Sequence, residues 1–482
     1  MSETAISPDT CTQDDLTCMD ATAQAQLIRT GEISALELVD HAIARFERIN
    51  PKINATASTN FEQARARARG QLPDGVFAGV PTLIKDLMPY PSHAAGFGTC
   101  LFDGVPAQGG SPYTEALDAS GLIVLGKSTT SEFGLLGTTE TTAKGATRNP
   151  WDLTRSPGGS SGGAAAAVAA GLVPVAHASD GGGSIRGPAS LCGLFGFKPS
   201  RDRTVSNGMP ADLPTAGLLS EHCLSRSVRD SANWLIATER PNIPAPLSPT
   251  EIATPNPPER LRIGFYLEDS RGQTPDPEIA TATQAAARLC EDLGHEVFDI
   301  APPVFDVDAT AQAFFALNGA VLAGFFDQFA QMMGPAFDED GFEPYTRTLV
   351  QRARLLAPDK LHATGAVMAS ALASVSATAE TCDVMLCPTI PFAAFPLGQY
   401  DPSKDPDRLN AFVERIASYT FPASLAGWPA MSVPLGQTAD GLPIGCHFAA
   451  APGQDARLFA LALQLEHAAP WQLRLTALAQ GL

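Results

Sequence analysis

The sequence predicts an α/β fold, because segments with strand and helix patterns alternate along most of the chain. The clearest example begins with an apolar strand at residues 261–266. A helix follows, in which apolar side chains repeat on one face from Ile279 to Leu293, and then a second strand near residues 296–300. Strand, helix and strand in this order predict a parallel pair of strands.

Composition and charge limit the classes of partner. The 482 residues are 44% hydrophobic and 17% charged, as in globular proteins, and length alone would suggest two or three domains. The 51 acidic and 32 basic residues give a net charge of −19. Such a charge argues against nucleic acid or an anionic membrane as a partner. Small neutral or cationic substrates remain compatible with it.

The cysteines and the N-terminal segment predict a cytoplasmic protein. The nine cysteines are scattered without zinc-type pairing, and Cys382 and Cys387 lack a matching second pair or nearby histidines. This pattern indicates free thiols in a reducing compartment. Residues 1–20 are polar and acidic, unlike a signal peptide. We find no run of about 18 apolar residues and therefore expect no membrane span.

In chain order, the first regular element is a helix that begins at Ser34. Ser34 and Glu37 form a capping box, and the apolar face that follows predicts a helix ending near Asn50–Pro51. Short apolar strands are expected just before Lys85 and at residues 121–127.

Two short motifs match known patterns without the structure that those patterns need. Residues 121–128 fit the phosphate-loop pattern G-x-x-x-x-G-K-S, but their middle residues, Leu-Ile-Val-Leu, are the predicted strand itself. Residues 158–162 fit the G-x-S-x-G pattern, yet residues 152–157 before them are polar and interrupted by proline rather than forming an apolar strand. We therefore expect neither a nucleotide site nor a nucleophile elbow.

The middle third of the chain differs in composition. Residues 240–259 are rich in proline and predict a long surface loop or a junction between subdomains. Residues 311–342 carry several phenylalanines and methionines. We interpret this stretch as a buried pair of helices. The alternative is that part of it walls an apolar pocket for an acyl or amine group.

Two glycine-rich loops, each around a serine, carry the strongest chemical signal. Residues 156–163 include Ser160 and residues 179–186 include Ser184, 24 positions later. Glycine has no Cβ, so such loops can bring several backbone N–H groups close to a developing negative charge. A serine in such a loop is placed to attack a carbonyl group. The helix-forming run at residues 164–170 argues against the alternative of two flexible surface turns.

A nucleophilic serine needs a base. The nearest histidine in the sequence is His177, which has no acidic residue in an obvious triad with it, although a partner distant in sequence stays open. Lys85 is the better candidate, because it follows Leu83 and Ile84, and apolar surroundings lower the pKa of an ammonium group. Taken alone, Lys85 also fits a surface lysine at the end of a strand.

Together, these segments resemble the amidase signature family. The resemblance rests on residues 79–86 around Lys85 and on the loops at residues 158–163 and 180–186, and it extends over nearly the whole chain. Further matching segments are residues 145–151, 196–199 and 441–445. Within the family, the chain is most similar to bacterial hydrolases of the 6-aminohexanoate cyclic dimer.

The resemblance implies a catalytic set of two serines and a lysine. It assigns Ser184 as the nucleophile, Ser160 as the bridging serine before a cis peptide bond, and Lys85 as the base. The expected reaction is hydrolysis of a carbon–nitrogen amide bond in a small, fairly apolar linear or cyclic amide through a serine acyl-enzyme. It needs neither a metal ion nor an organic cofactor.

The residues around the nucleophile loop have supporting roles by the same resemblance. The oxyanion hole is expected from the backbone N–H groups of Gly181, Gly182, Gly183 and Ser184. Asp180 and Arg186 are expected to brace the loop, as a structural salt bridge would, and Ser161 to support the base by a hydrogen bond. Gly181 and Gly187 occupy positions where the family more often has a side chain. The lack of side chains at these two positions would either widen the site or weaken the geometry of the oxyanion hole.

The resemblance also implies a mixed, mainly parallel sheet flanked by helices on both faces. We expect one catalytic domain over residues 1–482, with a catalytic core at about 70–235 and a less constrained lobe at about 240–380.

Other functions could use the same residues. A carbamate or ester hydrolase would pass through the same acyl-enzyme, and the amide-hydrolysing component of an aminoacyl-tRNA amidotransferase would carry the same residues inside a complex. The acidic charge and the nearer similarity favour a free-standing hydrolase whose partner is a small-molecule amide, with no nucleic acid and no membrane. The presence of all three chemical residues disfavours an inactive binding protein. A homodimer stays open.

Overall fold

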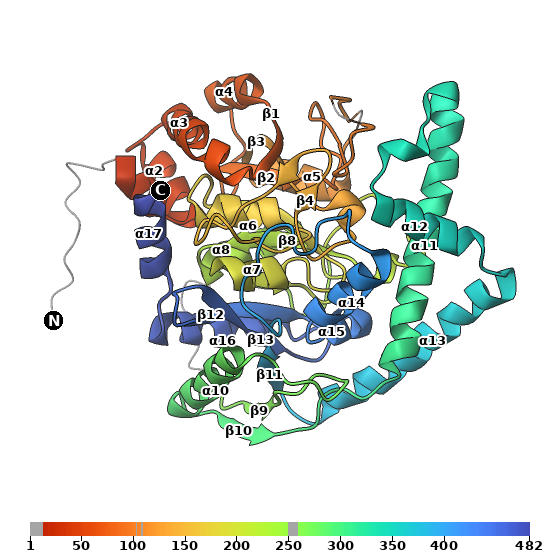
Figure 1. Cartoon of the computed structure of the whole chain (residues 1–482). Helices are drawn as coiled ribbons and strands as arrows, with labels where there is room; N and C mark the ends of the chain where they lie inside the picture. The colour runs from red at the N-terminus through yellow and green to blue at the C-terminus, as the bar shows by residue number, and fades with distance from the viewer. Residues whose placement is uncertain (1–12, 103, 108, 249–258) are drawn as a thin grey trace.

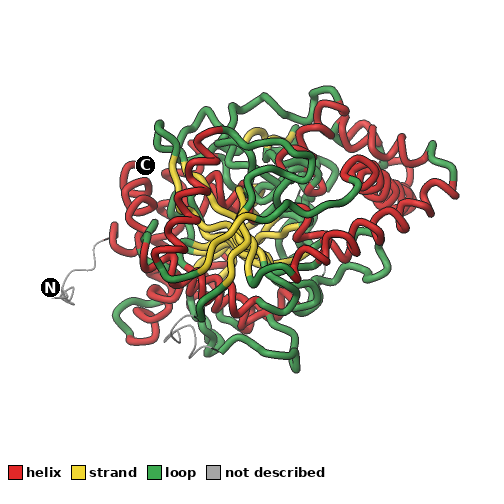
Figure 2. Tube along the Cα trace, turned by 90° about the horizontal axis from the view of Figure 1, so that it is seen from below, coloured by secondary structure: helices red, strands yellow, loops and turns green. Residues whose placement is uncertain are grey.

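An eight-stranded mixed sheet forms the centre of the protein, surrounded by helices (Figures 1 and 2). The computed structural model describes residues 13–102, 104–107, 109–248 and 259–482. In spatial order the strands are β10 (Glu296–Asp299), β9 (Arg262–Phe265), β11 (Val384–Pro388), β13 (Pro443–Ala449), β12 (Ala430–Gln437), β7 (Phe195–Lys198), β8 (Ser220–Ser225) and β6 (Val175–Asp180).

The predicted α/β fold is confirmed, but the expectation of a mainly parallel sheet is wrong. Among the described strands, parallel pairing in this sheet is confined to β10, β9 and β11, and the other neighbours pair antiparallel. The parallel part is the predicted strand–helix–strand unit, in which α10 (Pro277–Asp292) connects β9 to β10. The antiparallel part includes β12 and β13, which are joined by the short turn at residues 438–442, and a tight turn permits only antiparallel pairing.

A three-stranded sheet lies beside the large one. Its order is β1 (Thr56–Thr59), β3 (Ile123–Ser128) and β2 (Pro81–Lys85), with β2 and β3 parallel. Thr82 on β2 donates a hydrogen bond from Oγ1 to the Val175 carbonyl oxygen on β6, at 2.9 Å. The first half of β2 is therefore held against the last strand of the large sheet.

The helices around the sheets have the following bounds. They are α1 (Gln13–Cys18), α2 (Ala21–Thr30), α3 (Ala35–Ile53), α4 (Phe61–Arg69), α5 (Pro112–Ala119), α6 (Gly162–Ala169), α7 (Arg186–Cys192), α8 (Val228–Thr238), α14 (Pro406–Ile416), α15 (Phe421–Ala426), α16 (Asp455–Ala468) and α17 (Gln472–Gly481). The shorter elements are β4 (Glu140–Thr141), β5 (Gly145–Ala146), η1 (Glu132–Gly134), η2 (Ala216–Leu218), η3 (Gly334–Ala336), η4 (Glu339–Gly341) and η5 (Ala377–Glu380).

The helix α3 begins as predicted and ends later than predicted. The capping box of Ser34 and Glu37 is present, with the Ser34 backbone N–H 2.7 Å from Glu37 Oε2. The helix continues past Pro51 to Ile53, because its last turns bury Ile49 and Ile53 completely.

The segments that match the phosphate-loop and G-x-S-x-G patterns form neither a nucleotide site nor a nucleophile elbow, as expected. Residues 123–128 form β3, and Lys127 is fully buried with its Nζ 3.7 Å from Asp86 Oδ1, so the lysine cannot reach a nucleotide. Residues 152–157 contain no strand that could lead into a nucleophile elbow.

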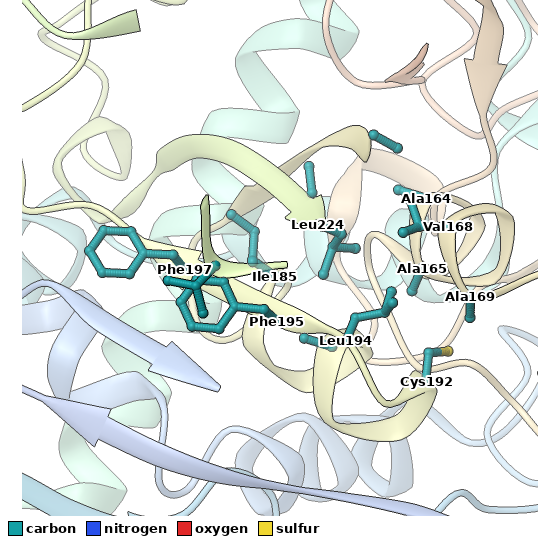
Figure 3. Packing of buried hydrophobic residues seen from close by; sticks show 14 of the residues in the cluster. Ala164, Ala165, Val168, Ala169, Ile185, Cys192, Leu194, Phe195, Phe197 and Leu224 are labelled. Atoms are coloured by element: carbon teal, nitrogen blue, oxygen red, sulfur yellow. The ribbon is translucent and has the colours of Figure 1, made fainter. Parts of the chain in front are cut away.

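The core between the helices and the large sheet fixes both glycine-rich loops. In Figure 3, Ile185 and Leu224 lie between the side chains of α6, such as Ala164 and Val168, and those of Phe195 and Phe197, and all belong to one buried cluster. The predicted helix at residues 164–170 is confirmed as α6, which is buried on all sides because its side chains are nearly all alanine. One glycine-rich loop leads into α6 and the other into α7, so both loops end at rigid elements.

Three helices project from one side of the sheet-containing body and form what we call the helical lobe (Figure 1). They are α11 (Val307–Met333), α12 (Pro344–Arg354) and α13 (Pro358–Ser376). The predicted pair of buried helices at residues 311–342 is wrong, because α11 is one continuous helix and its Met332 is 70% exposed. The segment predicted as a less constrained lobe, about residues 240–380, also contains β9 and β10 of the large sheet.

The helix from Val307 to Ala336 bears on the expectation that the chain has no membrane span. Among the described residues, it is the one helix long and apolar enough to cross a membrane by length and composition, with a mean hydropathy of 1.4 over a window that is 33% buried. The search of the sequence for a long apolar run missed it. One such helix is weak evidence for a span, since core helices pass the same test.

Candidate active site

The end of β2 places Lys85 inside the protein beside Ser160. Lys85 is 1% exposed, and its Nζ lies 2.7 Å from Ser160 Oγ. The same Nζ lies 3.0 Å from Ser179 Oγ and 3.3 Å from the Ser179 carbonyl oxygen. The alternative of a surface lysine is therefore wrong.

Burial changes the protonation of Lys85. Loss of hydration lowers the pKa of its ammonium group from 10.5 to about 7, although the negative charges of Glu221 and Asp180 act in the opposite direction. A lysine with this pKa is substantially neutral near neutral pH. It can then accept a proton from a hydroxyl group.

Ser160 lies in a loop whose glycines are fixed by close contacts. A Cβ on Gly159 would lie 2.6 Å from backbone atoms of Thr138, and Gly158 has a φ of +83°. The peptide bond between Gly159 and Ser160 is cis. The cis bond therefore precedes Ser160, and the expectation of a cis bond after this serine is wrong.

Ser161 supports the site less directly than predicted. Its Oγ donates to the Ser179 carbonyl oxygen at 3.3 Å, and within the described part of the chain it makes no hydrogen bond to Lys85. The expected contact is therefore wrong, and the two side chains instead share Ser179 as a partner. The sequence analysis missed Ser179, whose only signal was a polar residue near the end of an apolar strand before the second glycine-rich loop.

Asp180 and Arg186 form a buried, bidentate ion pair at the base of the nucleophile loop. Arg186 Nη2 lies 2.8 Å from Asp180 Oδ1, and Arg186 Nε lies 2.9 Å from Oδ2, with both residues fully buried. Burial alone would raise the pKa of Asp180, but the Arg186 charge and hydrogen bonds hold that pKa well below its usual range. Asp180 Oδ2 also accepts a hydrogen bond from the Ile185 N–H at 3.1 Å. The pair therefore closes the loop, as expected.

The loop is also attached to the segment around α15. Arg186 Nη1 donates to the Thr420 carbonyl oxygen at 2.8 Å, and Thr420 Oγ1 donates to the Gly182 carbonyl oxygen at 2.6 Å. Gly183 has a φ of +142°, and a Cβ there would lie 2.4 Å from Thr420 Oγ1. Glycine is therefore required at position 183.

The nucleophile loop presents unused backbone donors to a cavity. Within the described residues, the N–H groups of positions 181–184 donate to no acceptor in the protein. Ser184 makes no side-chain hydrogen bond in the same part of the chain, so its Oγ is not bonded to Ser160. The loop and Ser160 nevertheless line one cavity of about 480 Å³. The loop contributes Gly181, Gly182, Gly183 and Ser184 to the wall of this cavity.

The cavity is mainly apolar. Leu219, Ile390 and Ile416 line it from the body of the protein, and the helical lobe contributes one face of α11. That face consists of Phe314, Phe315, Asn318, Val321, Leu322 and Phe325, which recur with helical spacing. The alternative interpretation of residues 311–342, that part of them walls an apolar pocket, is confirmed.

Glu132 links the catalytic side of this cavity to the helical lobe. Its Oε2 accepts a hydrogen bond from the Glu343 backbone N–H at 3.0 Å and another from Thr346 Oγ1. Burial raises the pKa of Glu132 to about 7. Burial and the neighbouring Glu132 charge likewise raise the pKa of Glu343. Two carboxyl groups that favour their neutral forms therefore lie at the junction.

His177 has the acidic partner that the sequence did not reveal. His177 Nε2 lies 3.0 Å from Glu221 Oε2, and His177 Nδ1 accepts a hydrogen bond from the Lys85 backbone N–H at 3.2 Å. With Nδ1 as acceptor, the ring proton belongs on Nε2, facing Glu221. Both ring nitrogens are therefore engaged, and burial lowers the pKa of this histidine. His177 helps to position the end of β2.

The described residues contain no group of three or more His, Cys, Asp or Glu side chains that could hold a metal ion. The cysteines for which the structure gives side chains are free thiols.

Comparison with known proteins decides the family. The family model named Amidase matches residues 37–459. The chain belongs to the amidase signature family. A 6-aminohexanoate-cyclic-dimer hydrolase from Paenarthrobacter ureafaciens is 35% identical to this amidase over 480 residues, covering 94% of this chain and 96% of that protein.

Solved structures of amidases agree with this assignment. A 6-aminohexanoate cyclic dimer hydrolase complexed with substrate matches with a TM-score of 0.88 and 34% identity, over 96% of this chain and 99% of that chain. A bacterial aryl acylamidase matches with a TM-score of 0.85 and 25% identity, over the same 96% and 99%. This amidase is therefore an enzyme that hydrolyses amide bonds.

Proposed function

We propose that this amidase hydrolyses small, fairly apolar linear or cyclic amides through a serine acyl-enzyme. Ser184 is the nucleophile, Ser160 carries the proton, and Lys85 is the base. The observation that carries the proposal is the 2.7 Å separation of Lys85 Nζ and Ser160 Oγ, at the wall of the cavity that Ser184 also lines. The low pKa of Lys85, about 7, supports its role as a base.

In the first half of the reaction, Ser184 Oγ bonds to the carbonyl carbon of the amide. Its proton passes to Ser160, whose own proton passes to neutral Lys85. The negative charge that develops on the carbonyl oxygen is stabilised by the backbone N–H groups at positions 181–184, each worth about 3 kcal/mol in comparable sites. The proton then returns through Ser160 to the amide nitrogen, the carbon–nitrogen bond breaks, and the amine leaves. Protonation of the amide nitrogen matters because, without it, the amine would have to leave as an anion, which is a poor leaving group.

In the second half, water replaces Ser184 at the carbonyl carbon. The water gives its proton to the same relay as its oxygen bonds to the acyl carbon. The bond to Ser184 Oγ then breaks, the serine regains a proton, and a carboxylic acid is released. Neither half requires a metal ion or an organic cofactor in this scheme.

The cavity supports the choice of substrate class. About 480 Å³ with mainly apolar walls suits a small molecule that carries few charges. The similarity to proteins named as hydrolases of the 6-aminohexanoate cyclic dimer supports amides joined to short aliphatic chains. The net charge of −19 supports a small-molecule partner over nucleic acid, and the free thiols fit a cytoplasmic protein.

The proposal is tested with the purified chain alone. We expect turnover of at least one member of a panel of alkyl amides, anilides, carbamates and esters, without ATP, tRNA or a second protein. The preferred bond in that panel separates an amidase from a carbamate or ester hydrolase that uses the same acyl-enzyme. Activity that appears only with ATP and a partner protein would instead indicate an amidotransferase component.

The nucleophile is tested by labelling and substitution. A fluorophosphonate should label Ser184, as mapped by mass spectrometry, and Ser184→Ala should lower kcat by roughly a million-fold, as loss of a catalytic serine does elsewhere. The matched control is Ser374→Ala, since Ser374 is exposed on α13. Labelling of Ser160 or Ser161 in place of Ser184 would contradict the assignment.

A further inference from the structure

The glycines that line the cavity are of two kinds. Most are required by the backbone or by contacts: Gly134 has a φ of +74°, and a Cβ on Gly159 or Gly183 would clash with neighbouring atoms. Gly187 is different, because its φ lies outside the left-handed region and the nearest atom to an added Cβ is Ile390 Cγ2, at 3.8 Å. Neither backbone strain nor packing therefore explains glycine at position 187.

Helix stability does not explain it either. Gly187 is the second residue of α7, and its N–H donates to the Gly183 carbonyl oxygen at 2.7 Å. Alanine is a better helix former than glycine in such a position. The glycine is buried, yet the direction of its missing side chain is nearly empty. A buried glycine with empty space in front of it borders a void, and here that void is the cavity.

This empty space lies next to the nucleophile. Gly187 follows Ser184 by three positions on the turn that begins α7, and side chains with this spacing lie on one face with Cβ atoms about 5–6 Å apart. Ser184, Gly187 and Ile390 all line the same cavity. The missing side chain therefore leaves room between the nucleophile and Ile390, where the atoms adjoining the scissile bond would lie.

Gly181 repeats the arrangement. Its φ also lies outside the left-handed region, and the nearest atom to an added Cβ is Leu219 Cδ1, at 4.0 Å. Gly181 and Leu219 both line the cavity. The cavity is thus wide on two sides of the nucleophile loop, while Gly183, within the same loop, is held by Thr420.

We propose that Gly187 is a specificity-determining residue that admits amides whose carbon skeleton is branched or cyclic directly beside the scissile bond. The proposal rests on the proposed function and narrows its substrate class. A side chain at position 187 would fill the space that such a skeleton needs, whereas a slender linear chain would still pass. The residue acts by leaving volume free and takes no part in proton transfer.

The test compares isomers that differ only in width beside the amide. Hexanamide and 2-ethylbutanamide vary the acyl side, and N-butylacetamide and N-tert-butylacetamide vary the amine side. We expect Gly187→Ala to lower kcat/KM about tenfold for the broad member of at least one pair and to change the slender member by less than about twofold, since one methyl group in a pocket is worth at least about tenfold. Gly187→Val should increase the difference.

A second pair of variants controls for damage to the fold. Ile390→Phe fills the same space from the opposite wall without changing α7, and it should produce the same selectivity. Adding Ile390→Ala to Gly187→Ala removes Cγ2, the atom nearest to the added methyl group, and should restore hydrolysis of the broad amide. A purely structural effect of Gly187→Ala would not be rescued in this way.

The outcomes separate the two proposals. If the wild-type chain hydrolyses amides and Gly187→Ala changes broad and slender isomers by the same factor, the role of Gly187 is wrong and the proposed function stands. The role of Gly187 is also wrong, and the proposed function also stands, if Gly187→Ala changes kcat/KM for neither isomer. If the wild-type chain hydrolyses no amide in the panel, the proposed function fails first.

Discussion

The two sides of the cavity are built in opposite ways. On the catalytic side, buried polar groups are fixed by directional bonds, as in the Asp180–Arg186 pair and the contacts of Lys85 Nζ with Ser160 and Ser179. On the other side, α11 presents an apolar face that contacts the cavity through ring and alkyl surfaces. Directional bonds fix the geometry of the chemistry, whereas apolar surfaces define only volume. The difference indicates that reaction and substrate choice can be altered separately.

After the loss of Ser184, the largest expected effect comes from the catalytic side, at Lys85. Lys85→Ala should lose about 10²–10⁴-fold in rate, the contribution of a general base. Lys85→Arg should lose as much, because a guanidinium group does not release its proton at working pH. In the wild type, activity should rise with pH through an apparent pKa of about 7, as the neutral lysine becomes populated, and this rise should be absent from both variants.

The measurement is a pH–rate profile on a substrate that does not ionise. The control is Lys360→Arg, since Lys360 is exposed on α13. Near-normal rates in Lys85→Arg would mean that this lysine acts as a fixed charge. The base would then have to be sought elsewhere, and the contrast between the two sides would lose its main support.

The next effect concerns the junction between the two sides, at Glu132. Its pKa is about 7 in the folded protein and near 4.5 when unfolded, so its carboxyl group stabilises the fold fully below about pH 4.5. This contribution is lost as the pH rises through 7. Glutamine stays neutral and can still accept both hydrogen bonds. Ionisation of Glu132 should therefore lower the unfolding free energy of the wild type between pH 5 and pH 8. In Glu132→Gln this decrease should be smaller by about 2 kcal/mol.

Urea unfolding at a series of pH values measures this effect. The matched control is Glu339→Gln, also next to the lobe but 40% exposed in its side chain. If the unfolding free energy of Glu132→Gln depended on pH as it does in the wild type, ionisation of Glu132 would not contribute to the pH dependence of stability.

The smallest effect is expected on the apolar side, at Phe315. Phe315→Ala removes a ring from the α11 face that lines the cavity. We expect kcat/KM for a long-chain amide to fall about tenfold, because apolar contact with the chain is lost. Acetamide should be hydrolysed as before, and the apparent pKa of about 7 should not move.

Steady-state kinetics on both substrates check this prediction, with Gln312→Ala as control, because Gln312 is exposed on the same helix. A shift of the pH profile in Phe315→Ala would break the comparison, since it would show that the apolar side also tunes the chemistry.

The sequence predicts what depends on neighbours along the chain. The capping box at Ser34, the α6 helix and both glycine-rich loops follow from local spacing, and the structure contains all of them. The parallel unit of β9, α10 and β10 follows from hydrophobic periodicity. Lys85 could be placed inside the protein because two apolar residues precede it and because its segment resembles the amidase signature family, since the residues alone also fitted a surface lysine.

What the sequence could not give depends on contacts between distant segments. His177 and Glu221 are 44 positions apart and meet because β6 and β8 pair antiparallel. Ser179 takes the place expected for Ser161 because it faces Lys85 across the gap between β6 and β2. The continuity of α11 also involves a distant segment, because Gly319 lets this helix approach the α12 backbone, where an added Cβ would lie 2.5 Å from the Leu349 oxygen.

The depth of Lys85 has a consequence for how protons enter and leave the enzyme. Lys85 is 1% exposed and Ser160 is 2% exposed, so bulk water has almost no direct access to either group. In the proposed reaction, the proton taken from Ser184 is handed to the departing amine, and the proton taken from water returns to Ser184. In each half-reaction, the proton that the relay accepts is donated again before the half-reaction ends, so turnover needs no exchange of protons with the buffer. Over the whole cycle, the enzyme gives the Ser184 proton to the amine and replaces it with a proton from water.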